Sequence, residues 1–212
     1  MNELCPLCLS SDNSHFWRSE DRDYLHCLVC DLVFVPKASL PSLKTEKIKY
    51  DQHQNSPSNK GYREFLNRLL KPMKEYISCG SKGLDFGSGP GPTLSKMLQE
   101  DGYDMDIYDY FYANDPTIFE KKYNFITTTE VIEHLHDVDM EIDRLWSMLE
   151  KGGVLGIMTA FRPDYNKFGS WYYKRDLTHV RFFSPSSFEY LAKKLKGEIV
   201  FIDNGVVIVK KC

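Results

Sequence analysis

The sequence predicts an α/β fold: a mostly parallel sheet covered by helices, finishing in an antiparallel hairpin and preceded by a small cysteine-bearing unit. Three observations predict this fold. Two Cys-x-x-Cys pairs lie within the first 30 residues, strand-like and helix-like runs alternate after residue 80, and an Asn-Gly pair separates two β-rich runs near the C-terminus. The 212 residues, of which 42% are hydrophobic, suffice for one full domain and a small appendage.

Composition and charge exclude several classes of protein. The formal net charge is −3, which argues against the strong basic field of a nucleic-acid-binding domain. No run of 18 apolar residues is present, so neither a membrane-spanning helix nor a membrane partner is expected. The polar start of the chain lacks the apolar stretch of a signal peptide, and we expect a cytoplasmic protein.

Four cysteines near the start of the chain have the spacing of a metal site. They are Cys5, Cys8, Cys27 and Cys30. In the pattern Cys-x2-Cys-x18-Cys-x2-Cys, each pair can present two thiolates to one Zn²⁺. A unit of about 35 residues buries too little apolar surface to fold alone, so the metal would supply the missing stability. We predict a structural zinc ribbon with four cysteine ligands over residues 1–35; the alternatives are unrelated thiols or a redox-active pair.

The next segment connects this unit to the larger domain. Residues 36–60 carry three prolines, several serines and mixed charges, and we interpret them as a connector with one short helix over residues 43–50. From Tyr62 onward apolar side chains recur at helical spacing, and this helix is expected to bend or stop near Pro72. The larger domain is expected over residues 61–212.

From residue 80 the pattern changes to alternating strands and helices. We expect strands at residues 83–86, 105–108, 123–128 and 154–159, and helices at residues 93–100 and 138–150. Gly152 and Gly153 supply the left-handed stop with which helices often end. Such alternation indicates βαβ units and a parallel sheet.

The end of the chain predicts an antiparallel hairpin. A helix is expected over residues 184–196, followed by strands at 198–203 and 206–210. Asn204 and Gly205 between these strands form the strongest short hairpin signal, because a type I′ turn needs positive φ at both central residues.

The first strand of the larger domain leads into a glycine-rich loop, Gly-Ser-Gly-Pro-Gly at residues 87–91. Its glycines allow a ligand to approach the backbone, and Asp109 follows at the end of the next strand, where a carboxylate can accept ribose hydroxyls. The loop does not read Gly-x-Gly-x-x-Gly, so a nucleoside ligand fits better than a dinucleotide. The alternative is an ordinary glycine-rich turn.

The segment 84–91, Leu-Asp-Phe-Gly-Ser-Gly-Pro-Gly, resembles motif I of the class I S-adenosylmethionine (SAM)-dependent methyltransferases. Residues 130–135, 152–155 and the terminal hairpin are similar to later parts of that family. The resemblance covers about residues 62–212 and implies a Rossmann-like methyltransferase sheet with SAM as cofactor. Too few residues lie between Asp109 and Tyr123 for the family's usual third strand, so the adenine contacts stay unassigned. The residues implied to bind SAM are Asp85, Gly87, Ser88, Gly89, Gly91, Asp109 and Glu130.

Residues 161–183 form an insertion before the last helix, and eight of these 23 residues are aromatic. Ligands of open α/β sheets bind outside the carboxyl ends of the strands, where this insertion must lie. We interpret it as a wall of the acceptor site; the alternative is that the aromatic rings fill a core beneath a long loop.

Three polar residues after the third expected strand are candidates for catalysis. Glu130, Glu133 and His134 would share one helical face if a helix begins there. With His179 they resemble the metal-assisted O-methyltransferases of the ubiquinone pathway and of small RNAs, which implies Mg²⁺ at these four residues. The alternatives are polar residues at a helix start without metal, and His179 as general base or substrate contact. The catalytic candidates are His179, Glu133 and His134.

We expect a SAM-dependent methyltransferase whose acceptor is a small metabolite. Residues 1–60 carry 7 Lys and Arg against 8 Asp and Glu, which disfavours a phosphate-binding surface. The alternatives are an RNA methyltransferase that uses the ribbon for substrate binding and a non-catalytic SAM-binding interaction module. A nicotinamide-dependent oxidoreductase is disfavoured by the loop and by the terminal hairpin.

Overall fold

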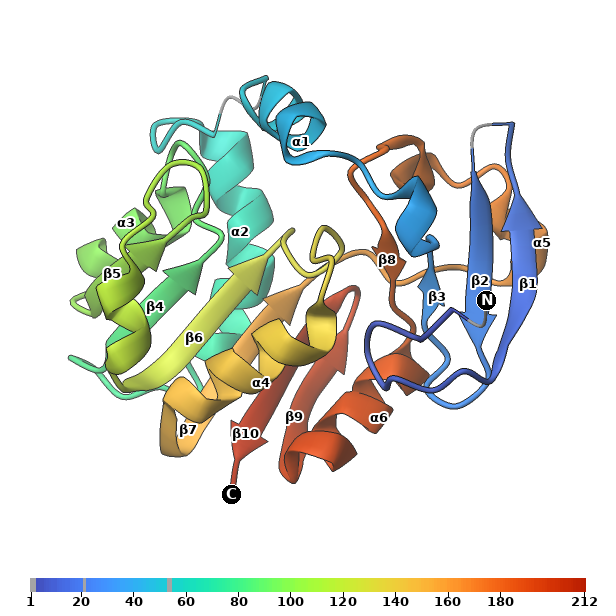
Figure 1. The fold of residues 1–212 in the computed structure, drawn as a ribbon. Coiled ribbons are helices and arrows are strands. Elements are labelled where there is room, and N and C mark those ends of the chain that lie inside the picture. Colours follow the sequence, from blue (N-terminus) through green and yellow to red (C-terminus); the bar gives the residue numbers. More distant parts are fainter. Residues whose placement is uncertain (1–2, 21, 53–54) are drawn as a thin grey trace.

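The computed structural model describes residues 3–20, 22–52 and 55–212, arranged around two sheets (Figure 1). The larger sheet has six strands in the order β5-β4-β6-β7-β10-β9, and the smaller has four in the order β1-β2-β3-β8. The strands of the larger sheet are β4 (Lys82–Phe86), β5 (Asp104–Tyr108), β6 (Tyr123–Thr129), β7 (Leu149–Met158), β9 (Gly197–Asp203) and β10 (Val206–Lys211).

The pairing in the larger sheet confirms the predicted fold class. β4 pairs in parallel with β5 and β6, β6 pairs in parallel with β7, and β10 lies antiparallel between β7 and β9. The hairpin turns at Asn204 and Gly205, whose φ angles are +46° and +81° as a type I′ turn requires. Among the described residues the sheet ends at β5, and the short segment before β6 holds only a 3₁₀ helix (Pro116–Glu120).

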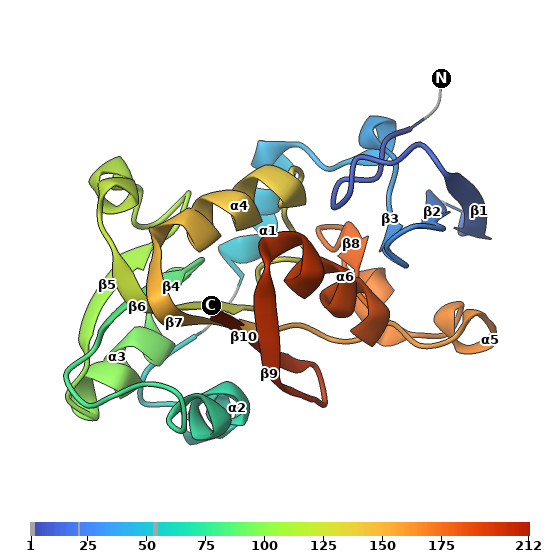
Figure 2. The same cartoon turned by 90° about the horizontal axis from the view of Figure 1, so that it is seen from below.

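Helices cover both faces of this sheet (Figure 2). Helices α2 (Lys60–Met73) and α3 (Thr93–Glu100) pack with one face into one apolar cluster. Helices α4 (Val138–Met148) and α6 (Pro185–Leu195) pack with the other face into a second cluster. None of the described helices is both long and apolar enough to cross a membrane.

Two local predictions in this domain are wrong. Helix α4 ends at Met148 and β7 starts at Leu149, so Gly152 does not stop the helix. With φ of +79°, Gly152 lies inside β7 where the register against β6 shifts, and the strand bulges there. Residues 130–134 form a turn rather than the first turn of a helix, beginning at Glu130 with φ of +53°.

The smaller sheet joins the N-terminal unit to the insertion. Its strands are β1 (Asn13–Arg18), β2 (Asp23–Cys27), β3 (Val33–Phe34) and β8 (Arg181–Phe182). β3 pairs antiparallel with β8, which is a strand of the insertion. Aromatic side chains of the insertion, including Phe168 and Phe182, pack with Tyr24 in a third apolar cluster. The core-filling interpretation is therefore confirmed for these rings.

The remaining helices are short. Helix α1 (Leu43–Tyr50) forms within the predicted connector, where Ser42 caps its first turn by accepting from the Thr45 amide. Helix α5 (Tyr165–Phe168) lies in the insertion, as does a 3₁₀ helix (Tyr172–Arg175). The domain boundaries at residues 35 and 60 stay predictions.

Candidate functional site

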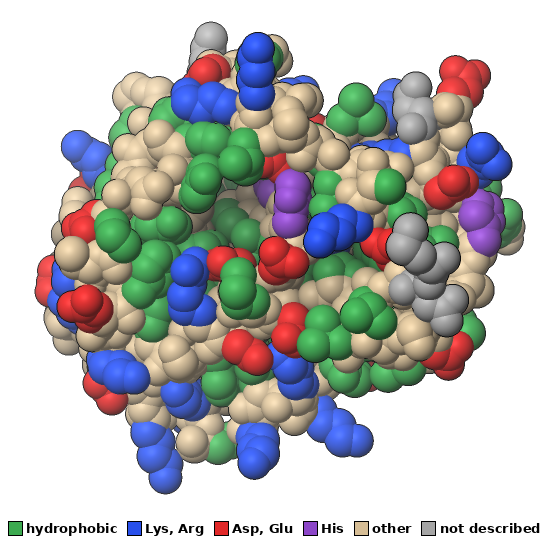
Figure 3. All heavy atoms as spheres, in the orientation of Figure 1, with side chains coloured by type: hydrophobic (Ala, Val, Ile, Leu, Met, Phe, Trp, Pro, Cys, Tyr) green, Lys and Arg blue, Asp and Glu red, His purple; other side chains and the backbone are tan. Residues whose placement is uncertain are grey.

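A cavity of about 1040 Å³ opens near the carboxyl ends of β4, β5 and β6. Figure 3 shows a hollow on this side of the molecule, with hydrophobic side chains inside it and a histidine and charged side chains nearby. Its walls come from the glycine loop, the segment after β5, the turn after β6, helix α1 and the insertion. The cavity therefore brings together segments that lie as far apart in sequence as Leu43 and His179.

The glycine loop and Asp109 form one wall through a network of backbone hydrogen bonds. The Gly89 amide donates to Oδ2 of Asp109 at 2.8 Å, while the amides of Phe111 and Tyr112 donate to Oδ1 at 2.9 and 3.1 Å. A Cβ at Gly87 would lie 2.4 Å from the Val131 side chain, and its φ is +78°. These contacts hold an acidic side chain against a glycine loop at the cavity edge.

Five of the seven residues predicted to bind the cofactor line this cavity. They are Gly87, Ser88, Gly89, Asp109 and Glu130. Asp85 is absent from the wall because it lies buried beneath the loop, where the Thr127 hydroxyl donates to Oδ1 at 3.0 Å. Burial raises the pKa of Asp85 to about 6. Gly91 is covered by the backbone of Asn55, whose carbonyl oxygen would lie 2.2 Å from a Cβ at that position.

The connector supplies a second wall that sequence reasoning missed. Glu46 on α1 is buried and accepts a hydrogen bond from Nε2 of His136 at 2.9 Å. Tyr50, one turn later, lies edge-on to the His134 ring with centroids 5.3 Å apart. The polar helix 43–50 carries no local signal for this role, since the role depends on where the chain places it.

Two buried carboxyl groups meet at Tyr173. The Tyr173 hydroxyl donates to Oε1 of Glu133 and lies 3.2 Å from Oε2 of Glu130. Burial raises the pKa of Glu130 to about 8 and that of Glu133 to about 7. Glu133 is fully buried, whereas Glu130 lies at the cavity wall. The Tyr173 hydroxyl therefore lies between one carboxyl group in the interior and one at the cavity.

Both predicted histidines line the cavity and have defined tautomers. Nδ1 of His134 lies 3.0 Å from the Thr178 carbonyl oxygen, and Nδ1 of His179 lies 2.7 Å from the Tyr173 carbonyl oxygen. Because a carbonyl oxygen only accepts, both Nδ1 atoms carry the hydrogen, and in the neutral rings both Nε2 atoms keep a lone pair. Burial lowers the pKa of both histidines, that of His179 to about 3. The two rings are therefore neutral near pH 7.

Donor atoms of Glu133, His134 and His179 lie within 4.8 Å of one another. Oε2 of Glu133 is buried without a hydrogen-bond partner among the described residues, as expected of an atom that meets a ligand. Glu130 lies outside this cluster. Two imidazoles and one carboxylate suit Zn²⁺, Mn²⁺ or Co²⁺, whereas Mg²⁺ prefers an all-oxygen shell, so the predicted Mg²⁺ site is not supported.

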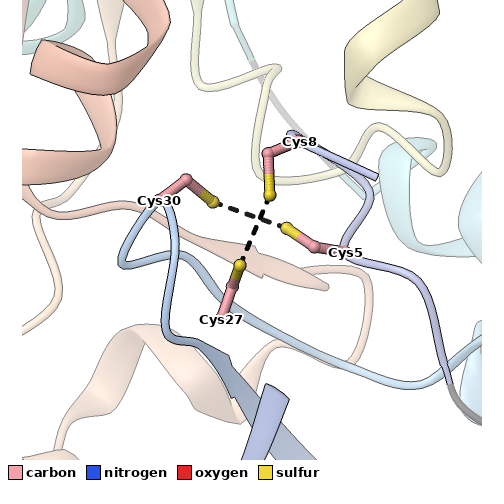
Figure 4. Close-up of side chains that lie close together, drawn as sticks. All are labelled: Cys5, Cys8, Cys27 and Cys30. Carbon is pink, nitrogen blue, oxygen red and sulfur yellow. Dashed lines mark hydrogen bonds between the residues drawn. The ribbon is translucent and has the colours of Figure 1, made fainter. Parts of the chain in front are cut away.

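The four N-terminal cysteines converge as their spacing predicts (Figure 4). The Sγ atoms of Cys5 and Cys30 are 3.5 Å apart and those of Cys8 and Cys27 are 3.4 Å apart. A tetrahedral Zn²⁺ with bonds of about 2.3 Å places its sulfur ligands about 3.8 Å apart. Burial raises the pKa of Cys8 to about 12, so a nearby cation is needed for the thiolate form. The cluster fits a zinc ion.

The comparisons with known proteins agree with this geometry. The family model described as a methyltransferase domain matches residues 52–196. The structure of 1,6-didemethyltoxoflavin-N1-methyltransferase from Burkholderia thailandensis, solved with 1,6-didemethyltoxoflavin and S-adenosylhomocysteine, is similar with a TM-score of 0.55. That alignment covers 88% of this chain and 98% of the other. At 13% sequence identity, the similarity shows a shared fold alone.

A SAM-dependent methyltransferase from Methanosarcina mazei aligns with a TM-score of 0.50 over 66% of this chain and 96% of its own, at 12% identity. No curated protein matches the chain significantly in sequence.

Proposed function

The chain belongs to the methyltransferase-domain family and is a SAM-dependent methyltransferase; on that premise we propose that it methylates a small organic acceptor in the cavity beside the glycine loop. The observation that carries the proposal is the continuity of this cavity, which reaches from Gly89 and Asp109 to His134 and His179. Pockets for one small ligand have volumes of about 300 to 1,000 Å³, so at about 1040 Å³ this cavity matches the largest of them, which supports a site shared by the cofactor and a small acceptor.

The cofactor side of the cavity is the glycine loop and Asp109. The Asp109 carboxylate accepts the ribose hydroxyls, with its orientation held by three backbone amides. The Ser88 hydroxyl is buried without a hydrogen-bond partner among the described residues, so it has a donor to offer the ligand. When bound, SAM supplies a methyl group on a sulfonium sulfur, and this group moves to the acceptor as the sulfur leaves with the bonding electrons. Glu130 lies at the wall, where the positive charge of the sulfonium would lower its raised pKa and favour the carboxylate form.

The acceptor side is formed by α1 and the insertion. Tyr50 and Tyr172 offer aromatic faces, while Asp176 and the two histidines offer hydrogen-bonding groups. Six acidic residues and three basic ones line the cavity, and one of the basic residues, Lys49, is paired with Asp176 at 3.4 Å, which disfavours a phosphate backbone. The toxoflavin-precursor methyltransferase from Burkholderia thailandensis also acts on a small molecule. These features favour a small hydroxylated or aromatic acceptor over RNA.

An acceptor hydroxyl loses its proton when the methyl group arrives, and this proton needs a destination. His179 lines the cavity and its Nε2 keeps a lone pair, while Nδ1 stays bonded to the Tyr173 carbonyl. Because burial lowers the pKa of His179 to about 3, it takes the proton only as the methyl group arrives, when the methylated hydroxyl becomes strongly acidic. The His134 ring lies edge-on to the His179 ring with centroids 4.7 Å apart, and a donor atom of Glu133 lies within 4.8 Å of both histidines. Positioning of acceptor and cofactor supplies most of the acceleration.

A second candidate role for the same cluster is a divalent transition-metal site. The unpartnered Oε2 of Glu133 favours it, as do the Nδ1–H bonds of both histidines to carbonyl oxygens, which are the usual outer contacts of metal-bound imidazoles. A metal there would bind and acidify the acceptor hydroxyl. Titration of the zinc-loaded protein with Co²⁺ tests it: a d–d absorption band that is lost in His179→Ala and kept in His15→Ala supports the site, and no band excludes it.

The main proposal is tested by isothermal titration calorimetry with SAM on protein of known zinc content. We expect Asp109→Ala to weaken SAM binding about tenfold or more, since it removes charge-assisted hydrogen bonds. Asp115→Ala is the control, because Asp115 caps the 3₁₀ helix (Pro116–Glu120) outside the cavity wall. NADH serves as the second ligand and is expected not to bind.

A screen of methyl acceptors then distinguishes a small-molecule methyltransferase from an RNA methyltransferase and from a non-catalytic module. Methyl transfer to hydroxylated or aromatic small molecules supports the proposal. Methyl transfer to tRNA or rRNA, with binding that weakens steeply between about 50 and 200 mM salt, would replace it with the RNA alternative. SAM binding without turnover on either set would favour the non-catalytic module, and absence of SAM binding by folded protein would refute the proposal.

A further inference from the structure

A buried arginine of the cysteine-bearing unit reaches into the insertion. Arg22 lies just before β2 and is only 7% exposed. Its Nη1 donates to the Leu177 carbonyl at 3.0 Å, and its Nη2 donates to the carbonyls of Lys174 and Asp176 at 3.0 and 3.3 Å. The guanidinium thus binds one short turn that lies about 150 residues later in the sequence.

Neutral oxygens surround this guanidinium. Besides the three carbonyls, Nε donates to the Tyr24 hydroxyl at 2.9 Å, and the described residues show no carboxylate paired with it. A buried charge without an opposite charge is costly and persists only where its hydrogen bonds are well made. An apolar residue would be easier to bury, and a lysine ammonium is more strongly hydrated and has fewer donors. The planar guanidinium, with its five N–H donors, is therefore a specific fit to this turn.

The turn that Arg22 holds ends at His179. The His179 amide donates to the Asp176 carbonyl at 3.1 Å, and the next amide, that of Val180, donates to the Glu133 carbonyl at 2.8 Å. The His179 ring is held by the Tyr173 carbonyl, one residue before Lys174. A shift of the turn would therefore move the imidazole relative to Glu133.

The same unit also holds the chain on the other side of His179. The Val35 amide donates to the Val180 carbonyl at 2.9 Å, and Arg181 donates from Nη1 to the Val35 carbonyl and from Nη2 to the His136 carbonyl. Asp31, next to Cys30, pairs with Arg162 near the start of the insertion and accepts a hydrogen bond from Ser184 just after its end. Contacts from the N-terminal unit therefore enclose the short segment that carries His179.

We propose that the N-terminal unit is a positioning element of the acceptor site and that Arg22 is a positioning residue for His179, since its guanidinium binds the three carbonyls of the turn that carries this histidine. The proposal rests on the proposed function for the role of His179. It assigns the unit a task inside the same molecule, because its contacts are directed at the insertion. Arg22 does not touch the cavity and acts only through the turn.

The test compares Arg22→Met with Arg22→Lys and with Arg18→Met. Arg18 is the matched control: it lies on the same hairpin, its side chain is 78% exposed and its partner is Asp23 within the hairpin. Hydrogen exchange followed by mass spectrometry measures the protection of residues 174–180, and ¹⁵N NMR of the imidazole measures whether Nδ1 of His179 still carries a hydrogen bonded to a carbonyl. Zinc content and SAM affinity are measured for every variant.

In Arg22→Met we expect the rate of hydrogen exchange over residues 174–180 to rise about tenfold. The Nδ1–H signal of His179 should move towards that of a solvated ring. Zinc content and SAM affinity should stay within about twofold of those of the unmodified chain. With the acceptor found by the screen, turnover falls about tenfold to a hundredfold, as expected of a displaced catalytic group. Arg22→Lys restores part of the protection, and Arg18→Met behaves as the unmodified chain.

An unchanged His179 signal and unchanged exchange in Arg22→Met would overturn the positioning role, as would an equal change in Arg18→Met. A loss of SAM affinity that parallels the loss of turnover would assign Arg22 to general stability instead. Failure of the unmodified protein to bind SAM refutes the proposed function and is read separately, because the exchange and imidazole signals need neither cofactor nor acceptor.

Discussion

The Tyr173 hydroxyl donates a hydrogen bond to the Glu133 carboxylate, across 40 residues of sequence, and joins the insertion to the turn after β6. The same hydroxyl lies 3.2 Å from Glu130 and 3.2 Å from the Thr159 hydroxyl. The Tyr173 hydroxyl donates to Oε1 of Glu133, while Oε2 of this carboxylate is buried without a partner among the described residues. The bond makes Tyr173 a support for both carboxyl groups of the site.

Tyr173→Phe is expected to lower the free energy of unfolding by about 1 to 3 kcal/mol, because it leaves a buried carboxylate with one donor fewer. It should also reduce turnover, since Glu133 and the neighbouring histidines lose their fixed geometry. Thermal or urea unfolding and a methyl-transfer assay measure the two effects. Tyr165→Phe is the control, as Tyr165 is 53% exposed and lies outside the cavity wall; an equal effect in both variants would contradict the assignment.

The buried Asp85 predicts a pH dependence of stability. Burial raises its pKa from 3.8 to about 6, so between these values the folded state binds more protons than the unfolded state and stability falls as pH rises. Asp85→Asn removes this titration. Without SAM, the difference in unfolding free energy, Asp85→Asn minus unmodified chain, should therefore increase by about 2 to 3 kcal/mol from pH 4 to pH 7.

Urea unfolding at several pH values measures this difference. Asp115→Asn is the control, because the Thr117 hydrogen bonds lower the pKa of Asp115 and no increase of this sign is expected there. A difference for Asp85→Asn that stays constant with pH would show that Asp85 is not held in its buried position beneath the loop.

Loss of the metal is expected to open the N-terminal unit and leave the cofactor side intact. Cys27→Ser removes one of four clustered ligands and should abolish zinc binding, with a loss of stability of about 4 kcal/mol or more. SAM binding should persist, because the glycine loop and Asp109 belong to the other sheet. Metal analysis measures the zinc content, calorimetry measures SAM binding, and thermal unfolding measures the stability. Cys212→Ser, at an exposed cysteine, should retain one zinc per chain; retention of zinc in Cys27→Ser would argue against a site with four cysteine ligands.

Comparing alanine substitutions at Gly87 and Gly102 separates the cost in stability of backbone strain from that of steric contact. Both have positive φ, +78° and +90°, but a Cβ meets the Val131 side chain at 2.4 Å only at Gly87, while nothing lies within 4 Å at Gly102. Gly102→Ala should cost about 1 kcal/mol from φ alone. Gly87→Ala should cost about 2 kcal/mol more and weaken SAM binding, because Val131 or the loop must move. Equal costs in urea unfolding, with unchanged SAM affinity, would contradict the tight loop packing.

Much of the fold could be predicted because its signals are local. Helices α1 and α3 begin and end where their spacing predicts, and the Asn204–Gly205 turn follows from the conformations that these two residues accept. The glycine loop and Asp109 were found for the same reason: each is defined by its place at the end of a strand. The failures near Gly152 and Glu130 are also local: a bulge replaced the expected helix stop at Gly152, and a turn replaced the expected helix start at Glu130.

The sequence by itself determined the fold class, the cysteine cluster and the glycine loop with Asp109 at the next strand end, because hydrophobic period, ligand spacing and turn residues act over a few neighbouring positions. Only the tertiary structure decided that β3 pairs with β8, that Arg22 holds the turn before His179 and that α1 covers the cavity. These contacts join segments about 90 to 155 residues apart in the chain. Their partners are chosen by packing of the whole molecule, for which no short stretch of sequence carries a signal.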